Sequence, residues 1–246
     1  MPADTPTILA TSGGVKESRR LPWEVGPLTE YAVDLAGVAG RAPRVCFVPT
    51  AMGDDAHTVS IFHSAAQLAG YESSHLSLFP MPNVDDVTAH LLAQDVVWVW
   101  GGSVAGLLAM WQLHGIGEAM RAAWEAGVVL TGVSAGSICW HTGGTTDSFG
   151  PDLRPVTNGL GLAPFSNGVH YDSEAQRRPF YQALVADGTL DPGYATDDGV
   201  GLLYQGSGTE VAMVEALTEE PGAAAYRVEP GPDGTAIETR IEPRLL

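Results

Sequence analysis

The stretch Val128-Val-Leu-Thr-Gly-Val-Ser-Ala-Gly-Ser-Ile-Cys-Trp140 decides the fold of this 246-residue chain. It joins an apolar, β-branched run to the motif Gly-x-Ser-x-Gly around Ser134, and a second short apolar stretch follows. This pattern is typical of a nucleophile elbow, in which a tight strand-to-helix turn lifts a serine hydroxyl out of the sheet. Gly132 and Gly136 stand where a Cβ would collide with neighbouring backbone. Glycine and serine are common in loops, so the motif alone is weak evidence for a catalytic serine. It favours catalysis here because a predicted strand precedes it and a predicted helix follows it.

Short apolar strands alternate with helical stretches through the first two-thirds of the chain. The predicted strands cover residues 7–11, 44–49, 74–79, 95–100 and 128–133. The predicted helices cover residues 24–38, 57–68, 85–94 and 104–126, the last with a break near 115–117. Strands that are almost continuously apolar and separated by helices indicate a parallel sheet covered on both faces. The sequence therefore predicts an α/β fold with a mostly parallel sheet between helices.

The pattern changes from about residue 195. Strands joined by glycine-rich turns are predicted at residues 198–204, 210–214, 224–228 and 236–241. We expect these to be extra, mostly antiparallel strands near the C-terminus. No Ser/Pro-rich linker or internal repeat marks a boundary, so residues 1–246 are predicted to form a single domain.

The charge balance excludes several classes of partner. The chain has 29 acidic and 12 basic residues and a formal net charge of -17. Such a surface repels phosphate backbones, so we expect neither a nucleic acid nor an anionic membrane as partner. Lys16 is the only lysine, which disfavours a Ser-Lys dyad built on Ser134.

The cysteines and the N-terminus indicate no metal and no export signal. Cys46 and Cys139 both lie in apolar surroundings and are predicted to be buried free thiols. The sequence has no CxxC, HxxxH or HExxH motif, so we expect no metal and no cofactor. No apolar stretch approaches the roughly 18–20 residues of a membrane span, and the first residues lack a basic and apolar leader. We therefore expect a soluble cytoplasmic protein.

A serine nucleophile needs a histidine base and a group that orients the imidazole. Of seven histidines, only His141 and His170 follow the elbow. His141 is predicted to lie two turns further along the elbow helix, about 10 Å from Ser134 by helical rise, which disfavours it as the base. His170 lies at an apolar-to-polar boundary before a helical stretch, where a strand end would face the elbow. We therefore predict His170 as the base.

The orienting acid is less determined because acidic residues are frequent in this chain. Asp147 lies between the serine and the histidine and is the favoured candidate. Asp152, Asp172 and Glu174 remain open as alternatives.

Four short motifs together resemble the peptidase E family, whose members are aspartyl dipeptidases related to cyanophycinases. In chain order they are Gly101-Gly102-Ser103 after a predicted strand, Gly-x-Ser-Ala-Gly-Ser at the elbow, Thr145-Thr146-Asp147, and His170-Tyr171-Asp172. The resemblance implies a flavodoxin-like fold similar to class I glutamine amidotransferases, which have cysteine at the elbow. Ser103 stands where the family commonly has asparagine.

The resemblance also implies roles for individual residues. Those in catalysis are Ser134 as nucleophile, His170 as base, Asp147 as triad acid, and Gly102 and Ala135 as backbone donors of an oxyanion hole. The family's dipeptidases recognise an N-terminal aspartate with an arginine downstream of the histidine. Arg177 and Arg178 are the candidates for substrate binding here.

We therefore expect a serine peptidase that cleaves short peptides, in particular dipeptides with an N-terminal aspartate, through an acyl-enzyme. A cyanophycinase-like or amidase activity on another acyl substrate would use the same residues and stays open. A non-catalytic ligand-binding protein on the same scaffold is the alternative from a different class. The expected partner is a small peptide, and a homodimer is left open.

Overall fold

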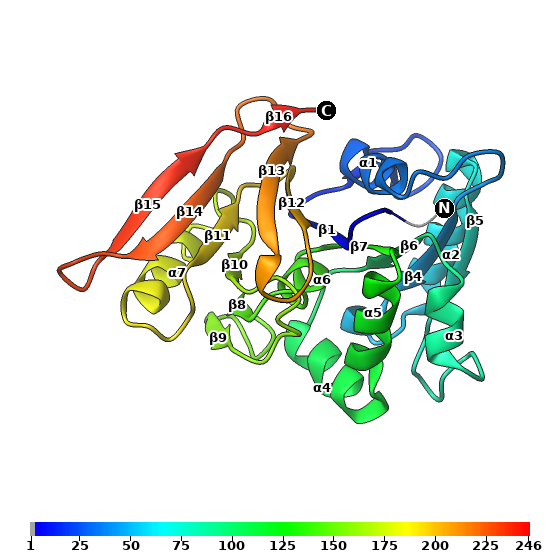
Figure 1. Ribbon diagram of the computed structural model, residues 1–246, viewed down its shortest axis with the longest axis horizontal. Coiled ribbons are helices and arrows are strands. Elements are labelled where there is room, and N and C mark those ends of the chain that lie inside the picture. The colour runs from blue at the N-terminus through cyan, green and yellow to red at the C-terminus, as the bar shows by residue number, and fades with distance from the viewer. Residues whose placement is uncertain (1–2) are drawn as a thin grey trace.

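An eight-stranded sheet carries the motif around Ser134 in the computed structural model, which describes residues 3–246 (Figure 1). Its strands, in spatial order, are β16 (Arg244–Leu245), β13 (Ala212–Thr218), β12 (Val200–Gln205), β1 (Thr7–Thr11), β7 (Val129–Val133), β6 (Val96–Val99), β4 (Arg44–Val48) and β5 (Glu72–His75). The five strands from β1 to β5 in this order pair in parallel, whereas β12 is antiparallel to both of its neighbours. The predicted α/β fold with a mostly parallel sheet is confirmed.

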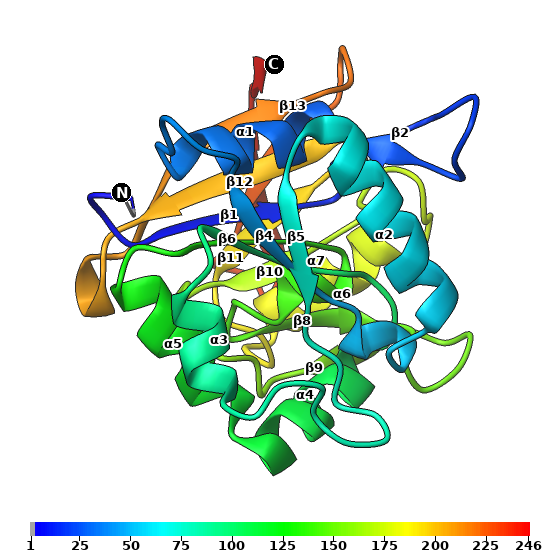
Figure 2. The ribbon, with the colours of Figure 1, turned by 90° about the vertical axis from the view of Figure 1, so that its right-hand side faces the viewer.

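The helices cover both faces of this sheet, as Figure 2 shows. They are α1 (Pro27–Leu35), α2 (Ala56–Ala69), α3 (Val87–Leu92), α4 (Val104–His114), α5 (Ile116–Glu125) and α6 (Ala135–Ile138). The chain also forms 3-10 turns η1 (Thr50–Met52) and η2 (Gly208–Glu210), and helix α7 (Arg177–Ala186), which packs on strands of the second sheet described below. Alternate residues of the strands pack on opposite sides. Trp98 and Phe47 lie against α1 and α2, while Val97 and Val99 lie with α3, α4, α5 and α6. Burial of both faces explains why the strands are almost wholly apolar.

A second sheet lies beside the first and was not predicted. Its strands, in order, are β15 (Ala236–Ile241), β14 (Ala225–Pro230), β11 (Gly193–Thr196), β10 (Ser166–Gly168), β8 (Gly143–Thr146) and β9 (Arg154–Val156), and a small hairpin pairs β2 (Val15–Lys16) with β3 (Glu24–Val25). The C-terminal strands divide between the sheets, since β12 and β13 extend the first while β14 and β15 join the second. Strands β8, β10 and β11 read GGTT, SNG and GYAT, and glycine and asparagine are poor sequence signals for a strand.

The predicted element boundaries differ from the structure in several places. The helix predicted at 24–38 covers only Pro27–Leu35 and follows strand β3, and the strand predicted at 210–214 covers Ala212–Thr218. The helical stretch 104–126 is divided at Gly115, whose φ of 67° ends α4 and precedes α5, as predicted. The strand predicted at 74–79 instead covers Glu72–His75. Across residues 3–246, none of the helices combines the length and the apolar character that crossing a bilayer requires. Cys46 and Cys139 are buried free thiols, as predicted.

Replacing Gly136 with alanine should destabilise the fold. A Cβ at Gly136 would lie 2.1 Å from the carbonyl oxygen of Val99, so backbone must move. Overpacking of this kind costs about 1–3 kcal/mol of the free energy of unfolding, to be measured by urea denaturation. Gly106→Ala, in exposed turns of α4, is the control, because its nearest neighbour is a side-chain hydroxyl at 3.1 Å. Equal stability of the two variants would contradict the packing argument.

Candidate active site

Ser134 occupies a strained turn between β7 and α6. Its φ of 57° and ψ of -113° are unusual for a residue with a side chain. The turn is held by two sets of backbone hydrogen bonds: the Ser134 amide donates to Thr11 O at 3.0 Å, and the Ser134 carbonyl accepts from Ser137 and Ile138, each at 2.9 Å. Strained backbone of this type persists where the surroundings determine it, and it is frequent at functional sites.

Glycines allow β6, β7 and α6 to approach one another at this turn. A Cβ on Gly132 would lie 2.2 Å from the carbonyl oxygen of Gly136, and one on Gly101 would lie 3.3 Å from Cβ of Ser134. Together with the contact between Gly136 and Val99, these spacings leave no room for larger residues. The local sequence thus produces the sharp turn predicted for a nucleophile elbow.

The turn opens onto a cavity of about 380 Å³ with a mostly polar lining. Its lining residues are Gly102, Ser103, Ser134, Asp147, Ser148, His170, Glu174 and Arg177. The structure therefore brings Ser134 and His170 to the same cavity from segments far apart in the sequence. Within residues 3–246 their side chains are not joined by a hydrogen bond, and such contacts commonly tighten only when substrate binds.

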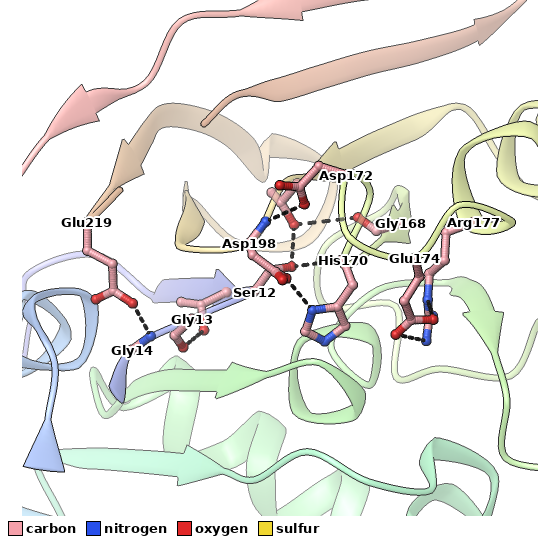
Figure 3. A network of polar contacts seen from close by, with 12 residues as sticks. Ser12, Gly13, Gly14, Gly168, His170, Asp172, Glu174, Arg177, Asp198 and Glu219 are labelled. Carbon is pink, nitrogen blue, oxygen red and sulfur yellow. Dashed lines mark hydrogen bonds and ion pairs between the residues drawn. The ribbon is translucent and has the colours of Figure 1, made fainter. Parts of the chain in front are cut away.

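His170 follows β10 and is oriented by Asp198, which follows β11 (Figure 3). The imidazole Nδ1 and Asp198 Oδ1 are 2.5 Å apart. This hydrogen bond is the main cause that lowers the pKa of the Asp198 carboxyl, so the acid stays ionised beside the ring. The backbone amide of Asp198 donates to Asp172 Oδ1 at 2.9 Å, and this hydrogen bond fixes the backbone of Asp198.

The backbone at His170 is also fixed by a link between the two sheets. His170 has a φ of 53°, and its amide donates to the Ser12 hydroxyl at 3.3 Å. Ser12 follows β1 of the first sheet, and its hydroxyl is 2.7 Å from that of Thr196, the last residue of β11. The pair Ser12–Thr196 therefore joins the first sheet to β11, the strand that Asp198 follows.

The acid that contacts His170 is not the one that the sequence predicted. Asp147 lines the cavity, but the carboxylate that contacts the imidazole is that of Asp198, which was not among the four candidates. Asp172 reaches Asp198 and not the ring, while Glu174 contacts Arg177. The reason lies in strand pairing: β10 and β11 are parallel neighbours, with Gly168 opposite Ala195, so the residues beyond their ends meet. The only sequence signal was a pair of aspartates, Asp197-Asp198, after the short run Gly193–Thr196.

The two predicted backbone donors lie where the elbow meets the end of β6. Ala135 begins α6, and its amide is at the helix N-terminus, where positive partial charge gathers. Gly102 lines the cavity with a φ of 130°, and a Cβ there would lie 2.5 Å from the carbonyl oxygen of Ala51. Among the residues the structure describes, neither amide has a hydrogen-bond acceptor.

The two predicted substrate arginines point to different places. Arg177, the first residue of α7, lines the cavity but is buried against Glu174. Arg178 is absent from the cavity lining: it pairs with Glu238 of β15, and its guanidinium lies 4.7 Å from the ring centre of Tyr226. The structure thus separates the pair, and only Arg177 is close to Ser134.

His141 is a buried core residue. The elbow helix ends at Ile138, so His141 does not continue it as expected. Its ring is within 2.9 Å of Ser137 O and 3.0 Å of the Tyr204 hydroxyl, and it has no exposed surface. Burial lowers the pKa of His141 to about 4, because the charged form is poorly solvated there.

Comparison with known proteins gives consistent matches. The sequence matches Peptidase family S51 over residues 8–212. The uncharacterized peptidase YgaJ of Bacillus subtilis (strain 168) is 40% identical over 186 residues, which span 76% of this chain and 78% of the relative. A solved peptidase from an acI-B1 actinobacterium superposes with a TM-score of 0.62 at 17% identity, covering 97% of this chain and 95% of that one. A Listeria monocytogenes EGD-e structure assigned to peptidase E gives 0.55 at 18% identity, with 85% and 97% covered. At such identities the two structures show the fold alone.

The buried His141 should make the protein less stable as the pH falls from about 6.5 to 4. In this window the unfolded chain protonates this histidine, with an ordinary pKa of about 6.5, while the folded protein keeps it neutral. The free energy of unfolding should fall by up to about 1.4 kcal/mol per pH unit from this residue. His141→Gln should flatten the dependence measured by denaturant titration, and the exposed His114→Gln is the control. An unchanged slope in His141→Gln would show that this ring does not control acid stability.

Proposed function

The chain belongs to Peptidase family S51, and from this premise we propose that it is a serine peptidase that hydrolyses short peptides through Ser134, His170 and Asp198. The observation that carries the proposal is the contact between His170 Nδ1 and Asp198, beside a strained serine in one cavity. A nucleophile, a base and an acid that orients the base are the parts that acyl transfer by serine requires.

The hydrogen bond to Asp198 sets the direction of proton transfer. With Nδ1–H donating to the carboxylate, the lone pair of Nε2 is free to accept the Ser134 proton. The serine oxygen then attacks the scissile carbonyl, and the amides of Gly102 and Ala135 stabilise the oxyanion. His170 next donates that proton to the leaving amine, which departs and leaves an ester on Ser134. Water attacks the ester with His170 again as base, and the serine is regenerated.

The size and lining of the cavity support a short substrate. A volume of about 380 Å³ is at the lower end of the usual range for small-molecule sites, about 300–1,000 Å³. The expected preference for an N-terminal aspartate required an arginine free to bind a carboxylate. Since Arg177 and Arg178 both have acidic partners, the proposal covers short peptides without an aspartate requirement.

Ser134→Ala should abolish hydrolysis of a dipeptide panel and leave the fold intact. Loss of the nucleophile should reduce kcat/KM by roughly 10³-fold or more. His170→Ala should be equally damaging, and the double variant no worse, because the two residues act as one unit. Peptide release is measured by chromatography, and circular dichroism checks folding. Activity of Ser134→Ala within tenfold of the parent would rule out this nucleophile.

Asp198→Asn should lower kcat strongly and KM little. An amide cannot hold the imidazole in the tautomer that leaves Nε2 free, and the loss in comparable triads is about 10⁴-fold. Asp147→Asn is the matched control, since it removes the same charge from a residue that lines the cavity but does not contact the ring. Its effect on kcat should be far smaller. If Asp147→Asn caused the larger loss of kcat, the role of acid would pass from Asp198 to Asp147.

A further inference from the structure

Arg177 is the one arginine among the residues that line the cavity, and its binding edge is already filled. Its Nε is 2.7 Å from Glu174 Oε2 and its Nη2 is 3.2 Å from Glu174 Oε1, which is a bidentate pairing (Figure 3). Its Nη1 donates to Thr145 O at 2.9 Å. A carboxylate of the chain itself therefore occupies the position at which an arginine would bind an acidic substrate side chain.

The two partners differ in their exposure to the cavity. The Arg177 side chain is 4% exposed and that of Glu174 is 40% exposed, so an entering substrate meets the carboxylate first. Glu174 also lies on the segment that begins at His170, and its amide donates to His170 O at 3.3 Å. The backbone of the acid is thus held next to that of the base, and both residues line the same cavity.

The balance of charge in the cavity is unfavourable for an acidic ligand. Asp147 and Glu174 supply two carboxylates to the lining against one guanidinium, which Glu174 already neutralises. An acidic side chain would have to displace Glu174 and then lie beside two like charges. A neutral side chain avoids both costs, and a cationic one gains attraction.

We propose that Glu174 is a specificity-determining residue, which blocks Arg177 and makes the enzyme prefer peptides whose residue before the scissile bond is neutral or cationic. This rests on the proposed peptidase function. It differs from the expectation that an arginine selects an N-terminal aspartate, because the guanidinium of Arg177 already has an intramolecular partner in Glu174.

The test is the charge preference of Glu174→Gln. The dipeptides Asp-Ala, Ala-Ala and Lys-Ala are compared by kcat/KM in the parent, Glu174→Gln and Glu242→Gln, which removes an equal charge from an exposed pair with Arg240. The parent should cleave Ala-Ala and Lys-Ala faster than Asp-Ala. Glu174→Gln should raise the ratio of Asp-Ala to Ala-Ala about 10- to 100-fold, the range of a charge-assisted hydrogen bond, and Glu242→Gln should leave it unchanged.

A second variant should change the charge preference in the opposite direction, and it keeps the proposal testable if Glu174→Gln does not fold. Arg177→Met leaves Glu174 uncompensated, so the ratio of Lys-Ala to Ala-Ala should rise while that of Asp-Ala falls further. An ion pair that only stabilises the fold would change the rates on all three dipeptides alike. A parent that prefers Asp-Ala, or variant ratios equal to those of the parent, would overturn the role of Glu174.

Measurements of binding test the role of Glu174 independently of the proposed peptidase activity. The affinities of the three dipeptides are measured by calorimetry on Ser134→Ala and on Ser134→Ala with Glu174→Gln, where no turnover is needed. A shift in affinity towards Asp-Ala in the double variant supports the role of Glu174 even if no peptide is hydrolysed. Hydrolysis that depends on Ser134 but shows no change in charge preference supports the peptidase and rejects the role of Glu174.

Discussion

The close approach of β6, β7 and the start of α6 is the constraint on which the site depends. Gly132 and Gly136 lie against backbone at distances that no Cβ tolerates, and this contact sets the tight turn at Ser134. The serine adopts a left-handed conformation that its side chain disfavours, and backbone hydrogen bonds to Thr11 and α6 hold it there. The energy stored in this turn is offset by the buried parallel strands on either side.

The histidine and the acid of the candidate site follow strands of the second sheet, whose position relative to this turn decides whether they reach the serine. Two parallel neighbours, β10 and β11, end side by side, and His170 and Asp198 extend from their ends. The hydroxyl pair Ser12–Thr196 ties that sheet to β1, which itself pairs with the elbow strand β7. The geometry of the candidate active site therefore depends on how the two sheets are joined, and residues that follow strands of both sheets line the cavity.

The fold and the elbow were accessible from the sequence because each is encoded locally. Strands buried on both faces must be apolar, and helices between them must return the chain to the same edge, so the mostly parallel sheet was predicted correctly. The second sheet was missed because its central strands are short and contain glycine, serine and asparagine. Buried polar strands such as Ser166–Gly168 form through pairing with their neighbours, and sequence periodicity carries no record of this.

The sequence by itself determined the class of fold, the tight turn at the serine and the burial of both cysteines, because these follow from the spacing of apolar residues, the small size of the residues beside the serine and the apolar surroundings of the thiols. Only the tertiary structure decided which carboxylate contacts the imidazole of His170 and which acidic residues pair with Arg177 and Arg178. Twenty-nine acidic residues make the partner of any histidine or arginine ambiguous along the chain. Strand register resolves that ambiguity, because it brings Asp198 to the imidazole, while the turn before α7 brings Glu174 to Arg177.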